Sequence, residues 1–474
     1  MPERLSAGRY DLAVVGSGPG GYAAALAAAR RGLRVCLIER EQWGGVCLNV
    51  GCIPTKALLA VSHFVRRLRQ AKRFGLTIHG YDLDWPAVLA RNERIITSLR
   101  RGLTELLRRE QVELVAGEAA FDSPQQLLVT RDGRPNPLEA HRIILATGAS
   151  PAPGPWPFDE RQILSYRGLL GLTQLPGSLL IIGGGVIGCE FASVFSAFGT
   201  RVTLVEQEPQ VLPGEDPEAV RWLTRRLEAD GVVILTGTTV TRLDRAAGGV
   251  TAALSNGGEC AAAAALIAIG QRPNIESLRL DAASIRHGRG VEVDGTLRTT
   301  QPHVAAIGDC VEGHGLAHWA SAEGGLAVRA LLQEPAEPLD PAEVPRCVYT
   351  DPEIARIGPL ESELGGAARV SRFSFGALGK SHCDEETEGF VKLLVDPATE
   401  RILGATIVGA QASSLIHVAV LAVHQGLTAR QLARTITAHP TLPEGITEAA
   451  AHLYGESLAV ASRAAAGLRP QAGS

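Results

Sequence analysis

The chain has 474 residues, of which 45% are hydrophobic and 20% are charged, and its formal net charge is −4. A chain of this length is expected to form about three domains, each large enough to bury a hydrophobic core without disulfide bonds. The small negative charge and the lack of a basic tract argue against nucleic-acid binding, and no run of about 18 apolar residues suggests a membrane span.

Residues 1–10, MPERLSAGRY, contain no apolar stretch typical of a signal peptide. We therefore expect a cytoplasmic protein in a reducing compartment. Most of its eight cysteines are scattered singly and are interpreted as small buried hydrophobic residues, whereas Cys47 and Cys52 form a close pair. No metal site is expected, and four residues belong to no motif that we can interpret: Cys310, His314, His382 and Cys383.

Two segments repeat one pattern, at residues 12–39 (LAVVGSGPGGYAAALAAARRGLRVCLIE) and 179–206 (LLIIGGGVIGCEFASVFSAFGTRVTLVE). Each predicts an apolar strand, a G-x-G-x-x-G turn, a helix of small residues and a second strand that ends in Glu. Such glycines let backbone amides at a helix N-terminus approach a pyrophosphate, and the acid can accept hydrogen bonds from ribose hydroxyls. The residues concerned are Gly16, Gly18, Gly21 and Glu39 in the first copy and Gly183, Gly185, Gly188 and Glu206 in the second.

Because both copies keep the same spacing from first Gly to Glu, they predict two dinucleotide sites. The alternative is a glycine turn in an α/β domain that binds no ligand. The second site is expected to prefer NAD over NADP, because the carboxylate of Glu206 would repel a 2′-phosphate. The segment that follows Glu206, QEPQ, also contains no cation that could bind this phosphate.

Cys47 and Cys52 lie in the segment GGVCLNVGCIPTK, residues 44–56. Their spacing does not suit a zinc site, and no second ligand pair is near. Since the following segment is helical, both thiols are expected near a helix N-terminus, which lowers a thiol pKa and favours thiolate chemistry. The alternative is two buried cysteines that never react.

The remaining elements follow in order along the chain. Apolar periodicity predicts helices at Lys56–Arg69 and Trp85–Glu110. Strands are predicted at 141–150, at Ala261–Ile269 and at 304–310, and the Pro-rich stretch 151–157 is expected to cross between domains. From about Pro345 the pattern changes to antiparallel strands, with helices from Ser413 onward and a frayed tail at 463–474.

His439 and Glu444 lie in the segment HPTLPE. A histidine titrates near neutral pH and can accept a proton from an incoming thiol, while a carboxylate on its other nitrogen fixes the tautomer. Pro440 and Pro443 predict a rigid loop and not a helix. The alternative is a surface histidine beside a surface acid.

The segment from Gly44 to Lys56 resembles the redox-active signature of class I pyridine nucleotide–disulfide oxidoreductases, and the likeness extends from Asp11 to about Tyr454. It includes TTQPHVAAIGD, where Ala305 replaces the usual aromatic residue, and Val46 replaces a usual Thr. The resemblance implies an α/β fold with two Rossmann-like dinucleotide-binding domains and a C-terminal α+β dimerisation domain. The expected division is an FAD domain at 1–150 and 271–345, an NAD domain at 151–270 and a dimerisation domain at 346–474.

The resemblance also implies roles for single residues. Cys47 and Cys52 would form a redox disulfide, and Lys56 would lie beside the flavin and pair with Glu190. His439 would meet Cys47 of the other subunit in a homodimer. Further cofactor-binding residues are expected at a strand end, at the ribityl chain and at a helix N-terminus beside the flavin: Thr147, Gly148, Gly270, Asp309 and Ala317.

Within the family, NAD preference argues against a glutathione reductase, and the lack of cysteines after Cys383 argues against a mercuric reductase. The segments DEETEGFVKLLVD and HPTLPE are most similar to dihydrolipoyl dehydrogenases. The expected reaction is oxidation of protein-bound dihydrolipoamide by NAD⁺, with a lipoyl-bearing acyltransferase component, a glycine-cleavage H-type protein or another lipoate-binding protein as partner. Alternatives are another disulfide or metal-ion reductase of the family, or a non-catalytic FAD-binding subunit.

Overall fold

The computed structural model describes residues 9–313 and 315–461, so His314 and the predicted frayed tail at 463–474 lie outside the described residues. The chain divides into two compact units. The first unit comprises Met1–Leu58, Asp84–Gln174 and Ile269–Leu339, and the second comprises Leu59–Leu83, Leu175–Ala268 and Asp340–Ser474. The division into three domains that the sequence suggests stays a prediction.

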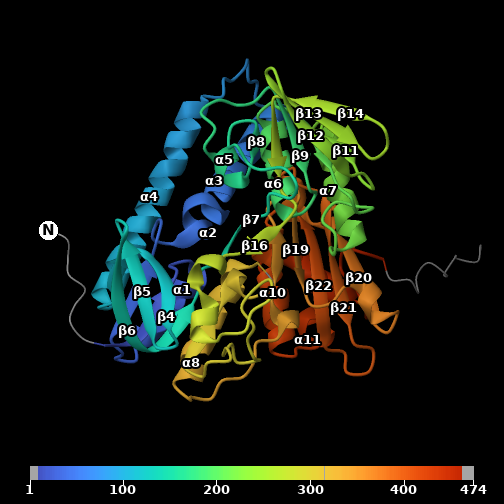
Figure 1. Cartoon of the computed structure of the whole chain (residues 1–474). Coiled ribbons are helices and arrows are strands. Elements are labelled where there is room, and N and C mark those ends of the chain that lie inside the picture. The colour runs from blue at the N-terminus through green and yellow to red at the C-terminus, as the bar shows by residue number, and fades with distance from the viewer. Residues whose placement is uncertain (1–8, 314, 462–474) are drawn as a thin grey trace, which may run out of the picture. The chain divides into compact units, whose positions relative to one another are not determined.

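The first unit contains a seven-stranded sheet in the order β3-β2-β1-β6-β5-β4, with β17 beside β6. Figure 1 labels β4, β5 and β6 of this sheet. Strands β1, β2, β3, β6 and β17 pair in parallel, and β4, β5 and the first part of β6 form antiparallel hairpins. The bounds are β1 Tyr10–Val15, β2 Val35–Glu39, β3 Glu113–Ala116, β4 Glu118–Ser123, β5 Gln126–Arg131, β6 Arg134–Leu145 and β17 Val304–Ala306. The apolar runs predicted from the sequence are therefore buried parallel strands.

Helices α1 and α8 pack closely in this unit because glycine lies at their crossing. A Cβ on Gly20 would lie 3.0 Å from the carbonyl oxygen of Ala320, and one on Gly324 would lie 2.7 Å from the oxygen of Gly20. The helices of the unit are α1 Pro19–Ala29, α2 Gly45–Val50, α4 Trp85–Arg109, α5 Tyr166–Leu170 and α8 Ala317–Leu331, with short 3₁₀ turns η2 Glu276–Leu278, η3 Leu280–Ala283 and η4 Gly308–Cys310. Its small strands are β7 Ala149–Pro151, β8 Ile163–Leu164 and β16 Gln271–Pro273.

Helix α3, Cys52–Arg69, carries the chain from the first unit into the second. The second unit holds a parallel sheet in the order β11-β10-β9-β15, and a three-stranded antiparallel sheet β12-β13-β14. The bounds are β9 Ser178–Ile182, β10 Arg201–Val205, β11 Val233–Leu235, β12 Val240–Ala246, β13 Gly249–Leu254, β14 Glu259–Ala262 and β15 Ala264–Ile267, with helices α6 Val186–Ala197 and α7 Pro217–Ala229 and the 3₁₀ turn η1 Ala71–Phe74.

The prediction of a single strand at Ala261–Ile269 is wrong. The strand is interrupted at Ala263, whose N–H donates to Ser178 Oγ at 3.0 Å. The two shorter strands on either side, β14 and β15, join different sheets. An uninterrupted apolar run gives no sign of such a break, because periodicity cannot separate two short buried strands.

A five-stranded antiparallel sheet, β18-β19-β22-β21-β20, follows in the second unit, as predicted from Pro345 onward. The strands are β18 Arg346–Val348, β19 Glu353–Ile357, β20 Arg369–Ser374, β21 Gly389–Val395 and β22 Ile402–Gly409. The helices are α9 Gly379–Cys383, α10 Ala412–His424, α11 Ala429–Ala433 and α12 Glu444–His452, with 3₁₀ turns η5 Pro341–Glu343, η6 Glu361–Leu364 and η7 Phe375–Ala377. The predicted α/β fold class, with Rossmann-like parallel sheets and a C-terminal α+β part, is confirmed.

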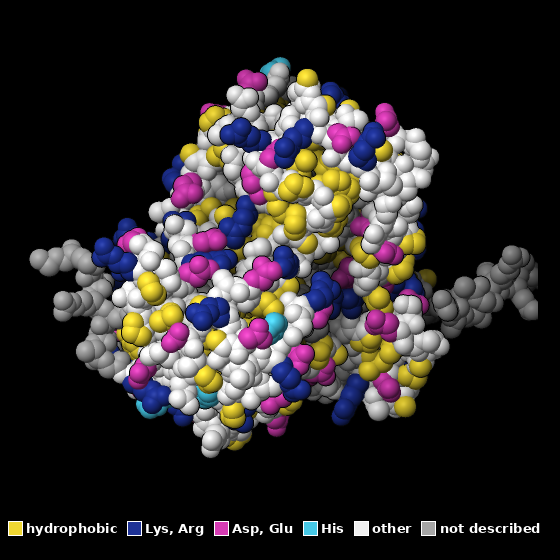
Figure 2. All heavy atoms as spheres, in the orientation of Figure 1, with side chains coloured by type: hydrophobic (Ala, Val, Ile, Leu, Met, Phe, Trp, Pro, Cys, Tyr) yellow, Lys and Arg dark blue, Asp and Glu magenta, His cyan; other side chains and the backbone are white. Residues whose placement is uncertain are grey.

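One stretch of the described residues, Gly45–Arg69, is long and apolar enough by length and composition alone to cross a membrane, with a mean hydropathy of 1.4 in its 18-residue window. It is two helices, α2 and α3, that meet at Gly51, and it carries Arg66, which is 3% exposed and bound to acidic groups. Only 28% of that window is buried, and no residue of α2 is fully buried. Side chains of both charge signs are interspersed on the face drawn in Figure 2.

Candidate redox and dinucleotide sites

The first glycine turn has the geometry of a phosphate cradle. Gly16 has φ +102°, and a Cβ on Gly21 would lie 1.8 Å from the carbonyl oxygen of Gly16, so only glycine permits this turn. Helix α1 begins directly after Gly18, and a Cβ on Gly18 would meet no atom within 4 Å. The turn therefore leaves open space at a helix N-terminus, where backbone amides and the helix dipole favour an anionic group.

The second turn repeats this geometry. Gly183 has φ +104°, and a Cβ on Gly188 would lie 2.0 Å from the oxygen of Gly183. Gly185 precedes helix α6, again with no atom within 4 Å of its missing Cβ. The two segments that repeat in sequence thus repeat in backbone conformation, and both fit a pyrophosphate.

Glu39 and Glu206 each reach back to their own glycine turn. Glu39 Oε2 accepts hydrogen bonds from the N–H of Ser17 at 3.0 Å and from its hydroxyl at 2.7 Å. Glu206 Oε2 accepts from the N–H of Gly184 at 2.6 Å, and its Oε1 accepts from Glu208 at 2.9 Å. Both acids therefore lie at the end of the second strand beside the turn, as a ribose-binding carboxylate must.

The redox segment packs directly against the first turn. The hydroxyl of Ser17, which is fully buried, accepts the N–H of Gly44 at 3.0 Å. A Cβ on Gly45 would lie 2.7 Å from the Cα of Gly18. Ser17 could not be predicted from the sequence, because a single serine between glycines has no characteristic spacing.

Gly51 lets the chain fold back so that the two cysteines meet. A Cβ there would lie 2.9 Å from the oxygen of Val46 and 3.3 Å from the Cα of Cys47. Cys52 is the first residue of helix α3, whereas Cys47 lies inside the short helix α2. The two thiols are both reduced and share a hydrogen bond.

The pKa of Cys47 is raised, first because of the hydrogen bond with Cys52, then because of burial and of charge on Cys52. Lys56 acts in the opposite direction. The expectation of a lowered pKa is therefore wrong for Cys47 in this dithiol form. Two thiolates so close would repel each other, and Cys47 is not at the N-terminus of the long helix.

Helix α4 braces the redox segment from one side. Arg100 Nε donates to Asn49 Oδ1 at 2.9 Å, and Asn49 Nδ2 donates to the oxygens of Gly45 and Trp43 at 2.8 and 3.1 Å. Two turns earlier, Asn92 Nδ2 donates to the oxygen of Pro54 at 3.3 Å. The helix is predicted by its apolar periodicity, whereas these contacts are not.

Thr147 and Gly148 follow strand β6 and are fixed by Asn274. Thr147 Oγ1 donates to the oxygen of Asn274 at 2.7 Å, and Asn274 Nδ2 donates to the oxygen of Thr147 at 3.0 Å. Gly148 and Gly270 have φ of +67° and +126°, and neither missing Cβ would meet an atom within 4 Å. Asn274 was not identified from the sequence.

Asp309 lies in the turn η4 after strand β17, and burial raises its pKa. The turn is held by Glu323 of helix α8, which accepts the N–H of Gly308 at 2.6 Å and the indole N–H of Trp319 at 2.6 Å. Burial also raises the pKa of Glu323. Helix α8 begins at Ala317, as predicted.

His439 and Glu444 form the predicted pair, with 2.8 Å between Nδ1 and Oε1. Partial burial acts to raise the pKa of Glu444, but hydrogen bonds from the N–H of Thr441 and from His439 outweigh it and leave the pKa lowered. The prediction of a loop without helix is wrong at one end, because Glu444 is the first residue of α12.

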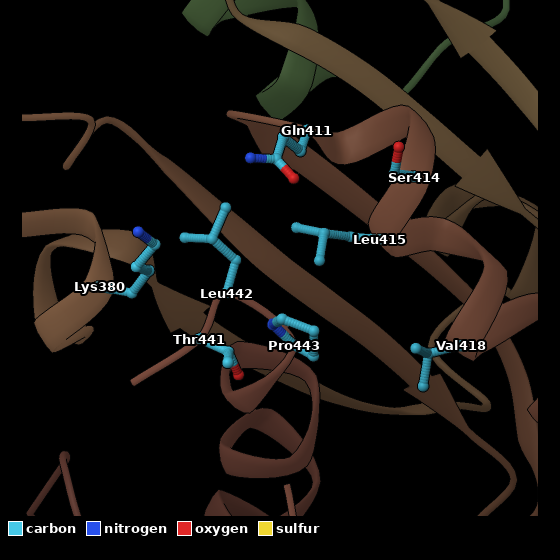
Figure 3. Close-up of a pocket in the computed structure, with 8 residues that line it drawn as sticks. All are labelled: Lys380, Gln411, Ser414, Leu415, Val418, Thr441, Leu442 and Pro443. Carbon is cyan, nitrogen blue, oxygen red and sulfur yellow. The ribbon is translucent and has the colours of Figure 1, made fainter. Parts of the chain in front are cut away.

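Beside this loop lies a cavity of about 350 Å³ (Figure 3). Its wall is mostly apolar, and its lining comes from α9, from the start of α10 and from the loop before α12: Lys380, Gln411, Ser414, Leu415, Val418, Thr441, Leu442 and Pro443. None of the predicted site residues lines it. Within the described residues, no group of three or more His, Cys, Asp or Glu side chains could hold a metal ion.

Lys56 belongs to the first unit and Glu190 to the second, so their predicted pairing stays a prediction. Glu190 is 3% exposed, and its Oε1 accepts the N–H of Tyr349 at 3.1 Å. The meeting of His439 with Cys47 across a dimer likewise stays a prediction.

Comparison with known proteins gives two family matches. The pyridine nucleotide-disulphide oxidoreductase family matches residues 10–324, and the dimerisation domain of that family matches residues 344–450. The dihydrolipoyl dehydrogenase of Bacillus subtilis is 36% identical over 448 residues, which cover 92% of this chain and 97% of the relative. The dihydrolipoyl dehydrogenase of Chlorobaculum tepidum is 39% identical over 455 residues, which cover 94% of this chain and 97% of that relative.

Solved structures show the same likeness. LpdA of Mycobacterium tuberculosis has a TM-score of 0.88 and 30% identity, over 93% of this chain and 99% of that chain. The Cu(II) complex of the HOCl-induced flavoprotein disulfide reductase RclA of Escherichia coli has a TM-score of 0.86 and 28% identity. The match covers 94% of this chain and 99% of that chain.

Proposed function

Since the chain belongs to the pyridine nucleotide-disulphide oxidoreductase family and is an oxidoreductase that uses FAD and NAD, we propose that it oxidises protein-bound dihydrolipoamide with NAD⁺. The observation that carries this proposal is the packing of the Cys47–Cys52 segment on the first glycine turn, through Ser17 and Gly45. A dithiol held against a dinucleotide turn suits electron transfer between sulfur and a bound flavin.

We assign the first fold, at 1–150 and 271–345, to FAD and the second, at 151–270, to NAD. The first would hold FAD through Gly16, Gly18, Gly21, Glu39 and Lys56, and through a second group: Thr147, Gly148, Asp309 and Ala317. The second would hold NAD through its own turn and Glu206, with Glu190 and Gly270 nearby. When bound, the flavin supplies the step that passes two electrons from sulfur to NAD⁺.

The sulfur chemistry follows from the described side chains. In the oxidised enzyme, His439, oriented by Glu444, takes the proton of a substrate thiol. The thiolate attacks Cys47, the Cys47–Cys52 bond breaks, and Cys52 leaves as a thiolate. The second substrate thiol gives its proton to the departing sulfur of Cys47 and displaces it, which closes the substrate disulfide and leaves Cys47 as a thiol and Cys52 as a thiolate. The substrate is oxidised by two electrons, and Lys56 favours negative charge on Cys47.

The match to a dimerisation domain supports a homodimer, in which His439 of one subunit would serve Cys47 of the other. The partner would be a lipoyl-bearing protein in the cytoplasm: an acyltransferase component, a glycine-cleavage H-type protein or another lipoate-binding protein. These assignments rest on family likeness and on the exposure of His439, whose side chain is 76% accessible in the single chain.

The test compares dihydrolipoamide, glutathione disulfide and Hg(II) as substrates, each with both nicotinamide cofactors. NADH formation from dihydrolipoamide should exceed the other activities. The Cys52→Ser protein should bind FAD but form no NADH. Full activity of Cys52→Ser with dihydrolipoamide would contradict the mechanism.

A second candidate is metal-ion reduction by the same dithiol. It is favoured by the likeness to RclA, which was solved as a Cu(II) complex. Cu(II)-dependent NADH oxidation that exceeds the dihydrolipoamide activity would support this candidate and displace the first.

A further inference from the structure

The short helix α5 is joined to the residues that follow strand β2. Although α5 lies beyond residue 150, where the FAD fold is expected to end, it belongs to the first unit. Arg167 Nη1 donates to Glu41 Oε2 at 2.9 Å, and the N–H of Glu41 donates to Glu39 Oε1 at 2.8 Å. Glu39 in turn binds Ser17 of the first glycine turn. Helix α5 therefore lies near the carboxyl ends of parallel strands, where open α/β sheets bind their ligands.

Tyr166 is the first residue of α5, and the residue before it fixes its place. Ser165 caps the helix, and its Oγ accepts the N–H of Arg167 at 3.1 Å. Glu160 accepts both the hydroxyl of Ser165 at 2.8 Å and its N–H at 3.1 Å. Leu169, one turn further along α5, is fully buried. The start of the helix is therefore held firmly, and the ring of Tyr166 is held inside the protein.

The hydroxyl of Tyr166 is buried without a partner from the protein. The residue is 5% exposed, and within the described part of the chain no group makes a hydrogen bond with its Oη. Burial raises the pKa of Tyr166, and Arg167 comes close enough to act against this rise, but without the geometry of a hydrogen bond. Buried hydroxyls in folded proteins are almost always paired, so this one points to an acceptor outside the chain.

The charge of Asp309 acts on this hydroxyl and raises the pKa of Tyr166 further. Asp309 lies in the same unit, in the turn that follows strand β17. Burial raises the pKa of Asp309 itself, and no hydrogen bond from the described residues offsets that rise. A donor and an acceptor that influence each other in this way suit a ligand that carries both kinds of group. The linker of FAD does so, because it contains ribityl hydroxyls and phosphate oxygens.

We propose that the hydroxyl of Tyr166 binds FAD by donating a hydrogen bond to an oxygen of its ribityl diphosphate linker. The inference rests on one part of the proposed function, the assignment of FAD to the first fold. Because the pKa of Tyr166 lies above its usual value, the hydroxyl keeps its proton at neutral pH and remains a donor.

The test measures how fast the holoenzyme loses FAD, as the flavin that appears in the filtrate after dilution and ultrafiltration. Tyr166→Phe removes the hydroxyl and keeps the ring, so the variant should fold. It should release FAD about tenfold faster, because one hydrogen bond to the linker is lost and such losses appear mainly in the dissociation rate.

The ³¹P spectrum of the bound FAD shows which oxygen accepts the hydrogen bond. If the acceptor is a phosphate oxygen, one phosphorus signal should shift in Tyr166→Phe. If the acceptor is a ribityl hydroxyl, both signals should stay in place while FAD release is still faster.

Tyr10→Phe is the matched control. Tyr10 is 2% exposed and belongs to the same unit, but it is the first residue of β1, at the opposite end of that strand from the glycine turn. The same atom is removed from the same type of residue, and the rate of FAD release should not change. Circular dichroism of each fresh holoenzyme shows whether the variant is folded.

Unchanged FAD release from Tyr166→Phe would overturn the proposal, and so would an equal acceleration in Tyr10→Phe. Gly18→Ala separates this outcome from a failure of the assignment on which the proposal rests. If Gly18→Ala does not speed the release of FAD, the assignment of FAD to the first fold is wrong. If Gly18→Ala speeds the release and Tyr166→Phe does not, the role of Tyr166 alone is wrong.

Discussion

Nδ1 of His439 lies 2.8 Å from Oε1 of Glu444, while the other oxygen of that carboxylate accepts the N–H of Thr441 at 2.7 Å. The acid is thus fixed by the backbone of its own loop before it orients the imidazole. Its lowered pKa keeps it ionised at neutral pH, so it can stabilise a protonated His439.

His439→Gln should therefore lower kcat/KM for dihydrolipoamide by about 10²–10⁴. Glu444→Gln should lower it less, because His439 keeps a hydrogen-bond acceptor. Steady-state kinetics measure both. The chain offers a matched control in His424, whose Nδ1 lies 2.7 Å from Glu343 on another exposed surface. His424→Gln should have no effect, and a loss equal to that of His439→Gln would reject the assigned role.

Two glycines of the first turn should respond differently to alanine. Gly21→Ala places a Cβ 1.8 Å from the oxygen of Gly16, which should destabilise the fold by about 3 kcal/mol or more. Gly18→Ala meets no protein atom within 4 Å, so it should fold normally but bind FAD roughly tenfold more weakly or worse. Thermal unfolding and flavin titration separate the two effects. Normal FAD affinity in folded Gly18→Ala would contradict the placement of the pyrophosphate.

Nicotinamide choice should depend on Glu206 alone of the two strand-end acids. Glu206→Gln keeps an acceptor for the N–H of Gly184 but removes the charge. It should raise KM for NAD⁺ and lessen the preference over NADP⁺, because the carboxylate no longer repels a 2′-phosphate. Glu39→Gln should leave KM for NAD⁺ unchanged and weaken the binding of FAD instead. Equal efficiency of the unmutated enzyme with NAD⁺ and NADP⁺ would refute this argument.

A buried ion network should govern the stability of the C-terminal sheet. Lys392 is 3% exposed, and its Nζ lies 2.8 Å from Asp216 and 2.9 Å from Glu218. Lys392→Met leaves Asp216 buried without a cation and should cost about 3–5 kcal/mol of unfolding free energy. Denaturant unfolding measures this cost. The exposed pair Lys380–Asp384 is the control, and Lys380→Met should not change the midpoint.

The same network predicts how stability changes with pH. Burial acts to lower the pKa of Lys392, but Asp216 and Glu218 raise it overall, so its contribution is complete below about pH 10.4, falls as the pH rises above that value and is gone once the pH passes the raised pKa. Burial acts to raise the pKa of Glu218, but Lys392 and Arg372 lower it overall, so its contribution is complete above about pH 4.3 and is lost as pH falls. If the part of the unfolding free energy that depends on Lys392 fell between pH 6 and 8, this assignment would be contradicted.

The sequence by itself determined the parts that rest on local chemistry. The repeated glycine turns, the acids that follow them and the His439–Glu444 pair are set by short spacings, because backbone conformation and near neighbours decide them. Asn49, Asn274 and Ser17 could not be foreseen in the same way. Each is a common polar residue with at least one partner 22 or more positions away along the chain, and no periodicity marks such a contact.

Only the tertiary structure decided which charges are buried together and where apolar runs divide. Arg66 and Asp230 are 164 positions apart, and nothing in either segment indicates that the other will satisfy it. The apolar stretch around Ala263 splits because a distant serine hydroxyl takes one backbone N–H out of the strand. Desolvation occurs only in the folded interior. The partners of a buried charge, and the raised pKa of Cys47, are therefore defined only when the chain is packed.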